Sequence, residues 1–276
     1  MNLARRGVIC GLLGMLTGCS PAALLNTTVS RKGYTLEADI PYGTDPRQKL
    51  DLYRPDTPRA DGKAVIFFYG GSWDSGTKSD YLFVAQALAA NGLTVIVPDY
   101  RLYPEVRFPA FVEDAALATR WAADRVGVEK LIAMGHSAGA HSALMLAANT
   151  RYLADAGVDR MKLAGAVGLA GPYSFLPLTS HRLQDIFGSA NDPATQPISF
   201  TVAPLPPVLL LHGEADRIVY PRNTVRLASA WQAAGGSAEM QLYPEVDHID
   251  VVAAMSSFLR ARAPTLADSM AFIDSH

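Results

Sequence analysis

The pattern of apolar and polar residues changes near position 64. Residues 34–41 and 48–54 partly alternate between apolar and polar positions, and the segment between them contains Gly, Asp and Pro. Alternation with a period of two is typical of strands that expose one face, so these segments predict an antiparallel hairpin. Residues 64–69 form a continuous apolar run, which is typical of strands covered on both faces.

Six segments predict strands, at residues 64–69, 93–98, 130–134, 163–170, 208–212 and 238–243, and those at 64–69, 93–98 and 208–212 are expected to be buried. Five helical patterns lie between or after them, at residues 79–91, 109–126, 138–149, 220–234 and 249–262. Alternating strands and helices predict a parallel sheet with right-handed crossovers and helices on both faces. Residues 171–207 interrupt this alternation and are rich in Pro and Ser. They predict an irregular insertion rather than a second domain.

The composition argues against several classes of function. The 276 residues are 49% hydrophobic, carry a formal net charge of −2 and suffice for one large domain. Lys and Arg are scattered, so we expect neither a nucleic-acid surface nor a polybasic membrane patch. The histidines are dispersed and no H-E-x-x-H motif occurs, so we expect no metal and no other cofactor.

The first residues have the features of an export signal. Arg5 and Arg6 precede a short apolar stretch, which ends in Leu16-Thr17-Gly18-Cys19. This order resembles the lipobox of bacterial lipoproteins, in which the cysteine is acylated and becomes the first mature residue. Alternatives are an ordinary secretory signal or a buried N-terminal helix.

From the leader we derive expectations for organisation and location. Residues 1–19 are expected to be a lipoprotein-type signal, residues 20–33 a linker and residues 34–276 one folded domain. Lipid on Cys19 would then hold the protein on the bacterial cell envelope. The only other cysteine, Cys10, also lies in the leader, so the predicted domain has no thiol for catalysis or disulfides. The oligomeric state stays open.

A candidate nucleophile lies between a predicted strand and a predicted helix. Gly135-His136-Ser137-Ala138-Gly139 matches G-x-S-x-G, and it follows strand 130–134 and begins helix 138–149. In that setting the serine occupies a strained turn that exposes its hydroxyl at the carboxyl edge of the sheet. The N-terminus of the following helix favours developing negative charge. The alternative is a glycine-rich turn with a purely structural role.

A serine hydroxyl needs a base to remove its proton, and His248 is the best placed of the six histidines. His248 follows the last predicted strand, at the edge of the sheet where Ser137 is expected. The positions of the other five favour local packing, hydrogen bonding or no role: His136, His141, His181, His212 and His276.

The third residue of a triad is expected after the preceding strand. Asp216 lies in that loop, where it would fix the imidazole tautomer and stabilise the imidazolium. The order Ser137, Asp216, His248 is the order expected for a G-x-S-x-G elbow. Three other carboxylates are weaker alternatives: Glu214, Asp247 and Asp250.

Backbone amides must stabilise the oxyanion in such a site. The amide of Ala138 is expected to be one donor, and the loop after strand 64–69 should supply the other. Gly71 is the best candidate there, and Ser72 is the alternative, because two glycines allow the loop to turn its amides inward. The alternative is a simple glycine turn with no role in catalysis.

At this point the chain resembles a known group of enzymes. It is similar to the esterase branch of the α/β hydrolases, which includes hormone-sensitive-lipase-like carboxylesterases, feruloyl-esterase-like proteins and kynurenine formamidases. Matching segments lie at residues 50–53, 69–73, 98–102, 135–139, 212–219 and 247–248. The resemblance implies an α/β-hydrolase fold with a mostly parallel sheet of about eight strands, helices on both faces and a short cap insertion at 171–207.

One position departs from the pattern of this group. Its members usually have His-Gly-Gly where this chain has Tyr69-Gly70-Gly71, so Tyr69 would have to brace the loop differently. Residues 99–101 match a segment that we interpret as structural.

The resemblance implies a carboxylesterase for small-molecule esters, and the lack of a large predicted lid favours short acyl groups. Residues expected near the substrate are Gly70, Trp73, His136 and Tyr173, with Phe175 as a further wall residue. Trp73 could equally be packing. The alternatives are an arylformamidase-type amide hydrolase, an acyltransferase, or a non-catalytic lipid-anchored binding protein.

Overall fold

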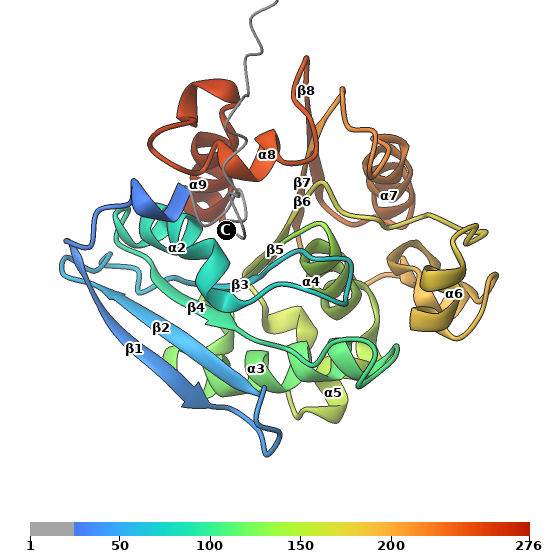
Figure 1. The fold of residues 1–276 in the computed structure, drawn as a ribbon, viewed down its shortest axis with the longest axis horizontal. Coiled ribbons are helices and arrows are strands. Elements are labelled where there is room, and N and C mark those ends of the chain that lie inside the picture. The colour runs from blue at the N-terminus through green and yellow to red at the C-terminus, as the bar shows by residue number, and fades with distance from the viewer. Residues whose placement is uncertain (1–24) are drawn as a thin grey trace, which may run out of the picture.

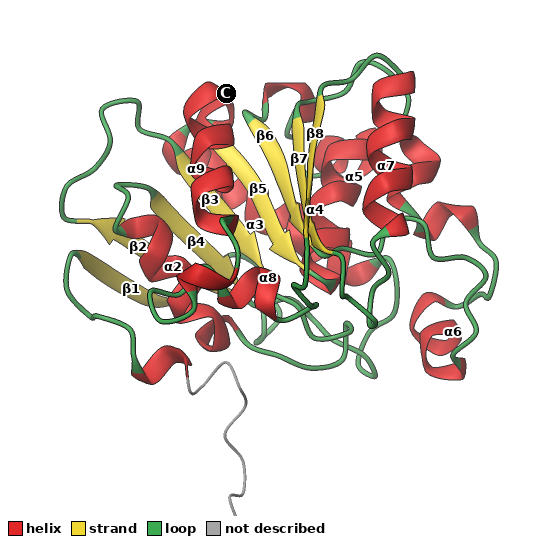
Figure 2. Ribbon diagram, turned by 90° about the horizontal axis from the view of Figure 1, so that it is seen from above, coloured by secondary structure: helices red, strands yellow, loops and turns green. Residues whose placement is uncertain are grey.

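The computed structural model describes residues 25–276, so the lipobox with Cys19 lies outside the described residues. Eight strands form one sheet in the order β1-β2-β4-β3-β5-β6-β7-β8 (Figure 2). Their bounds are β1 (Tyr34–Pro41), β2 (Lys49–Pro55), β3 (Ala64–Phe68), β4 (Thr94–Pro98), β5 (Leu131–His136), β6 (Gly165–Leu169), β7 (Val208–Gly213) and β8 (Ala238–Tyr243). The antiparallel hairpin β1–β2 is confirmed, and β3 to β8 run parallel.

Helices cover both faces of this sheet (Figure 1). Their bounds are α2 (Leu82–Ala89), α3 (Ala110–Val126), α4 (Ala138–Ala148), α5 (Thr150–Asp155), α6 (His181–Phe187), α7 (Arg222–Ala233), α8 (Asp250–Ala253) and α9 (Thr265–Ser275). The helices α3, α4 and α7 lie on one face, and α2 and α9 lie on the other. The predicted α/β-hydrolase fold is therefore confirmed. No helix of residues 25–276 is long and apolar enough to cross a membrane.

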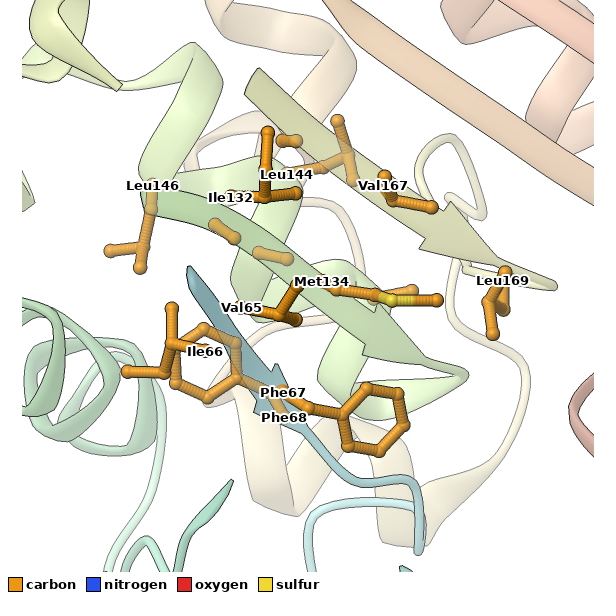
Figure 3. Packing of buried hydrophobic residues seen from close by; sticks show 14 of the residues in the cluster. Val65, Ile66, Phe67, Phe68, Ile132, Met134, Leu144, Leu146, Val167 and Leu169 are labelled. Atoms are coloured by element: carbon orange, nitrogen blue, oxygen red, sulfur yellow. The ribbon is translucent and has the colours of Figure 1, made fainter. Parts of the chain in front are cut away.

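The centre of the sheet forms the hydrophobic core. Every residue of β3, β5, β6 and β7 is buried, as their continuous apolar runs predict. Figure 3 shows side chains of the three strands β3, β5 and β6 beside Leu144 and Leu146 of α4. Close packing of this kind fixes the carboxyl ends of the strands, from which the loops of the site begin.

The predicted helix 249–262 is wrong. Only α8 (Asp250–Ala253) forms, and a second helix, α9, follows Pro264. The Ser256 hydroxyl donates to the Ala253 carbonyl at 2.7 Å and accepts from the Leu259 amide at 3.2 Å. A serine that bonds the local backbone in this way competes with the helical ladder, so the helix does not continue past this segment.

Residues 171–207 are less irregular than predicted. They contain α6, which begins after Ser180 and ends at Gly188 with a positive φ of 72°. This serine and glycine are typical helix boundaries, although α6 spans only residues 181–187. The helix α5 was also not predicted, and Asn149 caps it by accepting the Arg151 amide at 3.0 Å.

Candidate active site

Ser137 lies on the sharp turn between β5 and α4, as predicted. Its φ of 53° and ψ of −119° are unusual for a residue with a side chain, so the turn is strained. The flanking glycines are required by close backbone approach. A Cβ on Gly135 would overlap the backbone of Gly139, and a Cβ on Gly139 would overlap the carbonyl oxygen of Phe68.

The three residues predicted to form a triad are in contact. Ser137 Oγ lies 2.9 Å from His248 Nε2, and His248 Nδ1 lies 2.7 Å from Asp216 Oδ2. They come from the turn after β5, the loop after β8 and the loop after β7. The parallel strands bring these loops to one edge of the sheet, so residues 111 positions apart form a hydrogen bond.

Asp216 is buried but well supplied with donors. Its Oδ1 accepts the amides of Ile218 and Val219 at 2.8 and 2.9 Å. Burial alone would raise the pKa of Asp216, but hydrogen bonds from His212 and His248 and the charge of His248 hold that pKa below its ordinary value. An ionised Asp216 accepts a hydrogen from Nδ1 of His248, which leaves Nε2 free to accept one from Ser137.

His212 is a hydrogen-bonding residue, as predicted, and it also contacts Asp216. Its Nε2 lies 2.8 Å from the Val219 carbonyl oxygen and 3.1 Å from Asp216 Oδ2, while Nδ1 lies 2.7 Å from the Thr224 hydroxyl. Sequence reasoning missed the contact with Asp216. The spacing of four residues between His212 and Asp216 could have suggested it.

The alternative acids have other surroundings. Asp247 accepts the amides of Ile249 and Asp250 and so caps α8. Asp250 pairs with Arg262. Glu214 is exposed. The acceptor of the hydrogen bond from His248 Nδ1 is therefore Asp216, the acid predicted for it.

The loop after β3 has an unusual backbone. The φ angles are 139° at Gly71, 50° at Ser72 and 63° at Trp73, and the last two are strained for residues with side chains. Gly71 is required, because a Cβ there would overlap the Ser75 carbonyl oxygen. The loop lies beside Ser137, and Gly71 and Ser72 line the same cavity as that residue.

Tyr69 braces this loop in place of the histidine expected from the resemblance. Its hydroxyl donates to Asp99 Oδ1 at 2.9 Å and accepts from Arg47 at 3.0 Å. Its carbonyl oxygen accepts from the Tyr100 hydroxyl at 2.7 Å. The structural interpretation of residues 99–101 is thus supported, and Arg101 adds an ion pair to the buried Asp114.

The amides near Ser137 differ in their partners. The Gly70 amide donates to the Tyr81 hydroxyl at 3.2 Å and is therefore occupied. Within residues 25–276, the amides of Gly71 and Ser72 have no hydrogen-bond acceptor. Ala138 is the first residue of α4, where helix amides have no intrahelical acceptor. Amides at these three predicted positions are thus available to a ligand.

The chain also matches a known protein family. A model of the BD-FAE family matches residues 50–231. The chain belongs to the BD-FAE family. The predicted resemblance to the esterase branch of the α/β hydrolases is thereby confirmed.

The relatives of this BD-FAE family member include proteins named as esterases and as formamidases. A probable isoprenylcysteine alpha-carbonyl methylesterase of Oryza sativa is 30% identical over 236 residues, 76% of this chain and 57% of the relative. A kynurenine formamidase of Danio rerio is 30% identical over 143 residues, 51% of this chain and 48% of the relative. The chain thus spans about half the length of these relatives.

Solved structures agree on the fold. Esterase B from Lactobacillus rhamnosis superposes with a TM-score of 0.77 at 20% identity, and the match covers 92% of this chain and 90% of the other. At that identity the likeness shows the α/β-hydrolase fold.

His136, expected near the substrate, lines the cavity at Ser137, but both of its ring nitrogens are occupied. Nε2 lies 3.0 Å from the His248 carbonyl oxygen, and Nδ1 lies 3.2 Å from the Tyr81 hydroxyl. Burial, with the nearby His248, lowers the pKa of His136 to about 3, so the ring is neutral. Sequence reasoning missed Tyr81, and no motif marks it.

The prediction that Tyr173 forms a pocket wall is wrong. Its side chain is fully buried and packs against Gly168 and Gly171, whose missing side chains make room for the ring. Phe175 instead reaches the surface near Ser137, and its ring stacks on Trp73 at 6.2 Å between centroids.

Two cavities meet at Ser137. The first, about 460 Å³, is called the apolar pocket and is lined by residues that include Tyr81, Phe83, His248, Ile249 and Val252. The second, about 430 Å³, is called the arginine pocket and is lined by residues that include Trp73, Phe175, Leu183, Arg222 and Arg226. Ser72, Ser137 and Ile218 line both. A substrate with its reacting atom at Ser137 could therefore extend in two directions.

No group of His, Cys, Asp or Glu within the described part of the chain could hold a metal ion.

Proposed function

We propose that this BD-FAE family member is a carboxylesterase that cleaves esters of short acyl groups through an acyl-enzyme on Ser137. The observation that carries the proposal is the unbroken contact from Asp216 through His248 to Ser137, at 2.7 and 2.9 Å. These distances suit proton transfer between a nucleophile and its base.

The first half of the reaction follows from the two contacts of His248. Its Nε2 takes the proton of Ser137 as the hydroxyl oxygen attacks the ester carbonyl carbon. The ionised Asp216 holds Nδ1–H and stabilises the imidazolium that forms. The imidazolium then gives its proton to the leaving alcohol, and the bond to the alcohol breaks. In the second half, water attacks the acyl-enzyme by the same route and releases the acid.

The negative charge on the carbonyl oxygen needs fixed donors. The amide of Ala138 is one donor in this proposal. Gly71 is the other, with Ser72 as the alternative, because both amides lack a partner in residues 25–276. The glycine-turn explanation for this loop predicts no such free amides beside Ser137.

The experiment is covalent labelling with a fluorophosphonate probe, combined with hydrolysis of p-nitrophenyl butyrate. Ser137→Ala should lose both labelling and turnover. Ser142→Ala is the matched control, because Ser142 lies on α4 and, within residues 25–276, its hydroxyl hydrogen-bonds only to the Ala138 carbonyl. It should keep both. Labelling that survives in Ser137→Ala would remove Ser137 from the mechanism, and a folded wild type inert to all probes would favour the binding-protein alternative.

The names of the relatives include a formamidase, so ester and amide cleavage must be compared. The same triad serves both reactions. Parallel assays with aryl esters and N-formyl aryl amides decide between them, and we expect the ester to have the larger kcat/KM.

A further inference from the structure

The arginine pocket has one sign of charge. Among the described residues that line it, Arg222 and Arg226 are the only charged ones, and no Asp or Glu is present. Both arginines come from the first turns of α7 and are exposed at the pocket. The remaining lining is aromatic, aliphatic or neutral polar. A neutral substrate gains nothing from such a charge pattern.

Neither arginine forms an ion pair within residues 25–276, unlike several other arginines of the same chain. Arg54 pairs with Glu37, Arg101 with Asp114 and Arg182 with Asp74. The guanidinium of Arg222 instead lies over the Tyr220 ring, 4.7 Å from its centroid. Stacking of this kind restrains a guanidinium without neutralising it.

The placement of the two arginines is also unfavourable for the helix. Arg222 is the first residue of α7, and no acidic residue lies in the first turn. A cation there opposes the positive end of the helix dipole. Arg226 lies four residues further, and like charges at that spacing repel each other. An anion bound between them would relieve both effects.

The position of His248 distinguishes the apolar pocket from the arginine pocket. His248, which must protonate the leaving alcohol, lines the apolar pocket and not the arginine pocket. The alcohol therefore fits the apolar pocket, and the acyl group fits the arginine pocket. This assignment places the two guanidinium groups beyond the acyl chain.

We propose that the arginine pocket binds an anionic group on the acyl chain, so that the preferred substrates are half-esters of short dicarboxylic acids. The inference rests on the proposed esterase function and names its substrate class. A carboxylate matches the planar fork of a guanidinium and can accept two hydrogen bonds from it.

The experiment compares matched pairs of ethyl esters by proton release in a pH-stat at pH 8. Each pair has the same acyl length, as in monoethyl succinate with ethyl butyrate, and the glutarate and adipate half-esters with ethyl pentanoate and ethyl hexanoate. The measured quantity is the ratio of kcat/KM for the charged ester to that for the neutral one. In Arg222→Gln/Arg226→Gln this ratio should fall at least about fivefold for the best length, because the charged ester loses its guanidinium partners and the neutral ester has none to lose.

The controls separate this proposal from simpler effects. Arg54→Gln removes the same charge on β2, near the opposite edge of the sheet, and should leave the ratio unchanged. High salt should lower the ratio of the wild type but not that of the double variant. The double variant should be at least as heat-stable as the wild type, because the repulsion in α7 is gone.

Other outcomes are equally informative. A ratio that is the same in the wild type and the double variant overturns the proposal, even where neutral esters confirm the esterase function. Butyrate esters of an alcohol that carries a carboxylate form the second arm. An arginine-dependent gain only in that arm supports the anion site and overturns the assignment of the acyl group to it. Absence of turnover on every ester is a failure of the proposed function itself.

Discussion

The imidazole Nε2 of His136 lies 3.0 Å from the backbone carbonyl oxygen of His248. Because a carbonyl can only accept, Nε2 carries the hydrogen and Nδ1 accepts from the Tyr81 hydroxyl. Burial raises the pKa of Tyr81 to about 12, so its hydroxyl stays protonated. The same hydroxyl accepts the Gly70 amide. This chain of hydrogen bonds joins the loop beside Gly71 to the backbone of His248.

From this chain we predict that His136 is a positioning residue. His136→Phe should lower kcat by about tenfold to a hundredfold with little change in KM, because a small displacement of His248 impairs proton transfer more than binding. His136→Gln, which can still donate to the carbonyl, should recover part of that loss. Steady-state kinetics and thermal melting test this prediction. A loss of heat stability without a change in kcat would show that His136 is only structural.

A second prediction concerns the acid. Asp216→Asn should lower kcat by roughly 10⁴, since an amide favours the wrong tautomer of His248 and cannot stabilise the imidazolium. Asp247→Asn is the matched control, because it changes the neighbour of His248 in the same way but only affects the cap of α8. It should change kcat by less than about tenfold. Equal losses in the two variants would contradict the assignment.

The sequence predicts the eight strands of this fold but fails at several of its helices. The central strands β3 to β7 are predicted because buried strands have apolar runs bounded by turns. The helices α5, α6 and α8 have only 6, 7 and 4 residues, too few to establish a period of 3.6. The break at Ser256 depends on a serine side chain turning to the backbone, and such a choice is decided by the tertiary surroundings.

The same division holds for the candidate site. Motif and chain order place Ser137, Asp216 and His248, because each follows a strand and strand ends share one edge of the sheet. The positions of Tyr81 and Tyr173 do not follow from any spacing. Tyr81 reaches His136 from the segment before α2, and Tyr173 is buried where two glycines make room for it.

A third prediction concerns stability in acid. Burial lowers the pKa of His141 from 6.5 to about 4, because the ring is enclosed by Trp73, Phe175 and Phe187. Between these pH values the unfolded chain binds a proton that the folded chain does not. The free energy of unfolding therefore rises with pH in this window and falls on acidification, by at most about 1.4 kcal/mol per pH unit from this residue.

Urea unfolding of His141→Gln between pH 4.5 and 6.5 tests this prediction. Glutamine can keep the hydrogen bond to the Thr195 carbonyl but does not titrate, so the slope of unfolding free energy against pH should decrease. His276→Gln is the control, since His276 is exposed at the end of the chain. An unchanged slope in His141→Gln would show that the buried ring is protonated as easily as a free one.

A fourth prediction concerns Cys19, which lies outside the described residues. We propose that Cys19 carries lipid in a bacterial host and that this lipid holds the enzyme on the cell envelope. Stable attachment needs more than one acyl chain, and lipoprotein processing supplies them. Cys19→Ser should abolish incorporation of radiolabelled palmitate and release the protein from the membrane fraction. Cys10→Ser should retain the label. Label that persists in Cys19→Ser would show that the lipobox interpretation is mistaken.

The last prediction concerns the length of a neutral acyl chain. The segment 171–207 contributes one α-helix of seven residues, α6, and two short 3₁₀-helices, so it holds no long amphipathic helix that could cover the site. The buried Trp73 ring packs against Phe111, Phe175 and Phe187, and Trp73 and Phe175 of this cluster line the arginine pocket, to which the acyl group is assigned. Each additional methylene gains about 0.8 kcal/mol only where it can be buried, and the arginine pocket leads from Ser137 to the exposed Arg222 and Arg226.

We therefore expect kcat/KM of p-nitrophenyl esters to be highest for acyl groups of about two to four carbons. Trp73→Leu removes ring volume from the cluster and should move the maximum toward longer chains, whereas Trp121→Leu, on the outer part of α3, should leave it in place. The measurement is log(kcat/KM) plotted against acyl length for the three proteins. A steady rise through twelve carbons in the wild type, or activation by a lipid interface, would make this enzyme a lipase and contradict the proposal of short acyl groups.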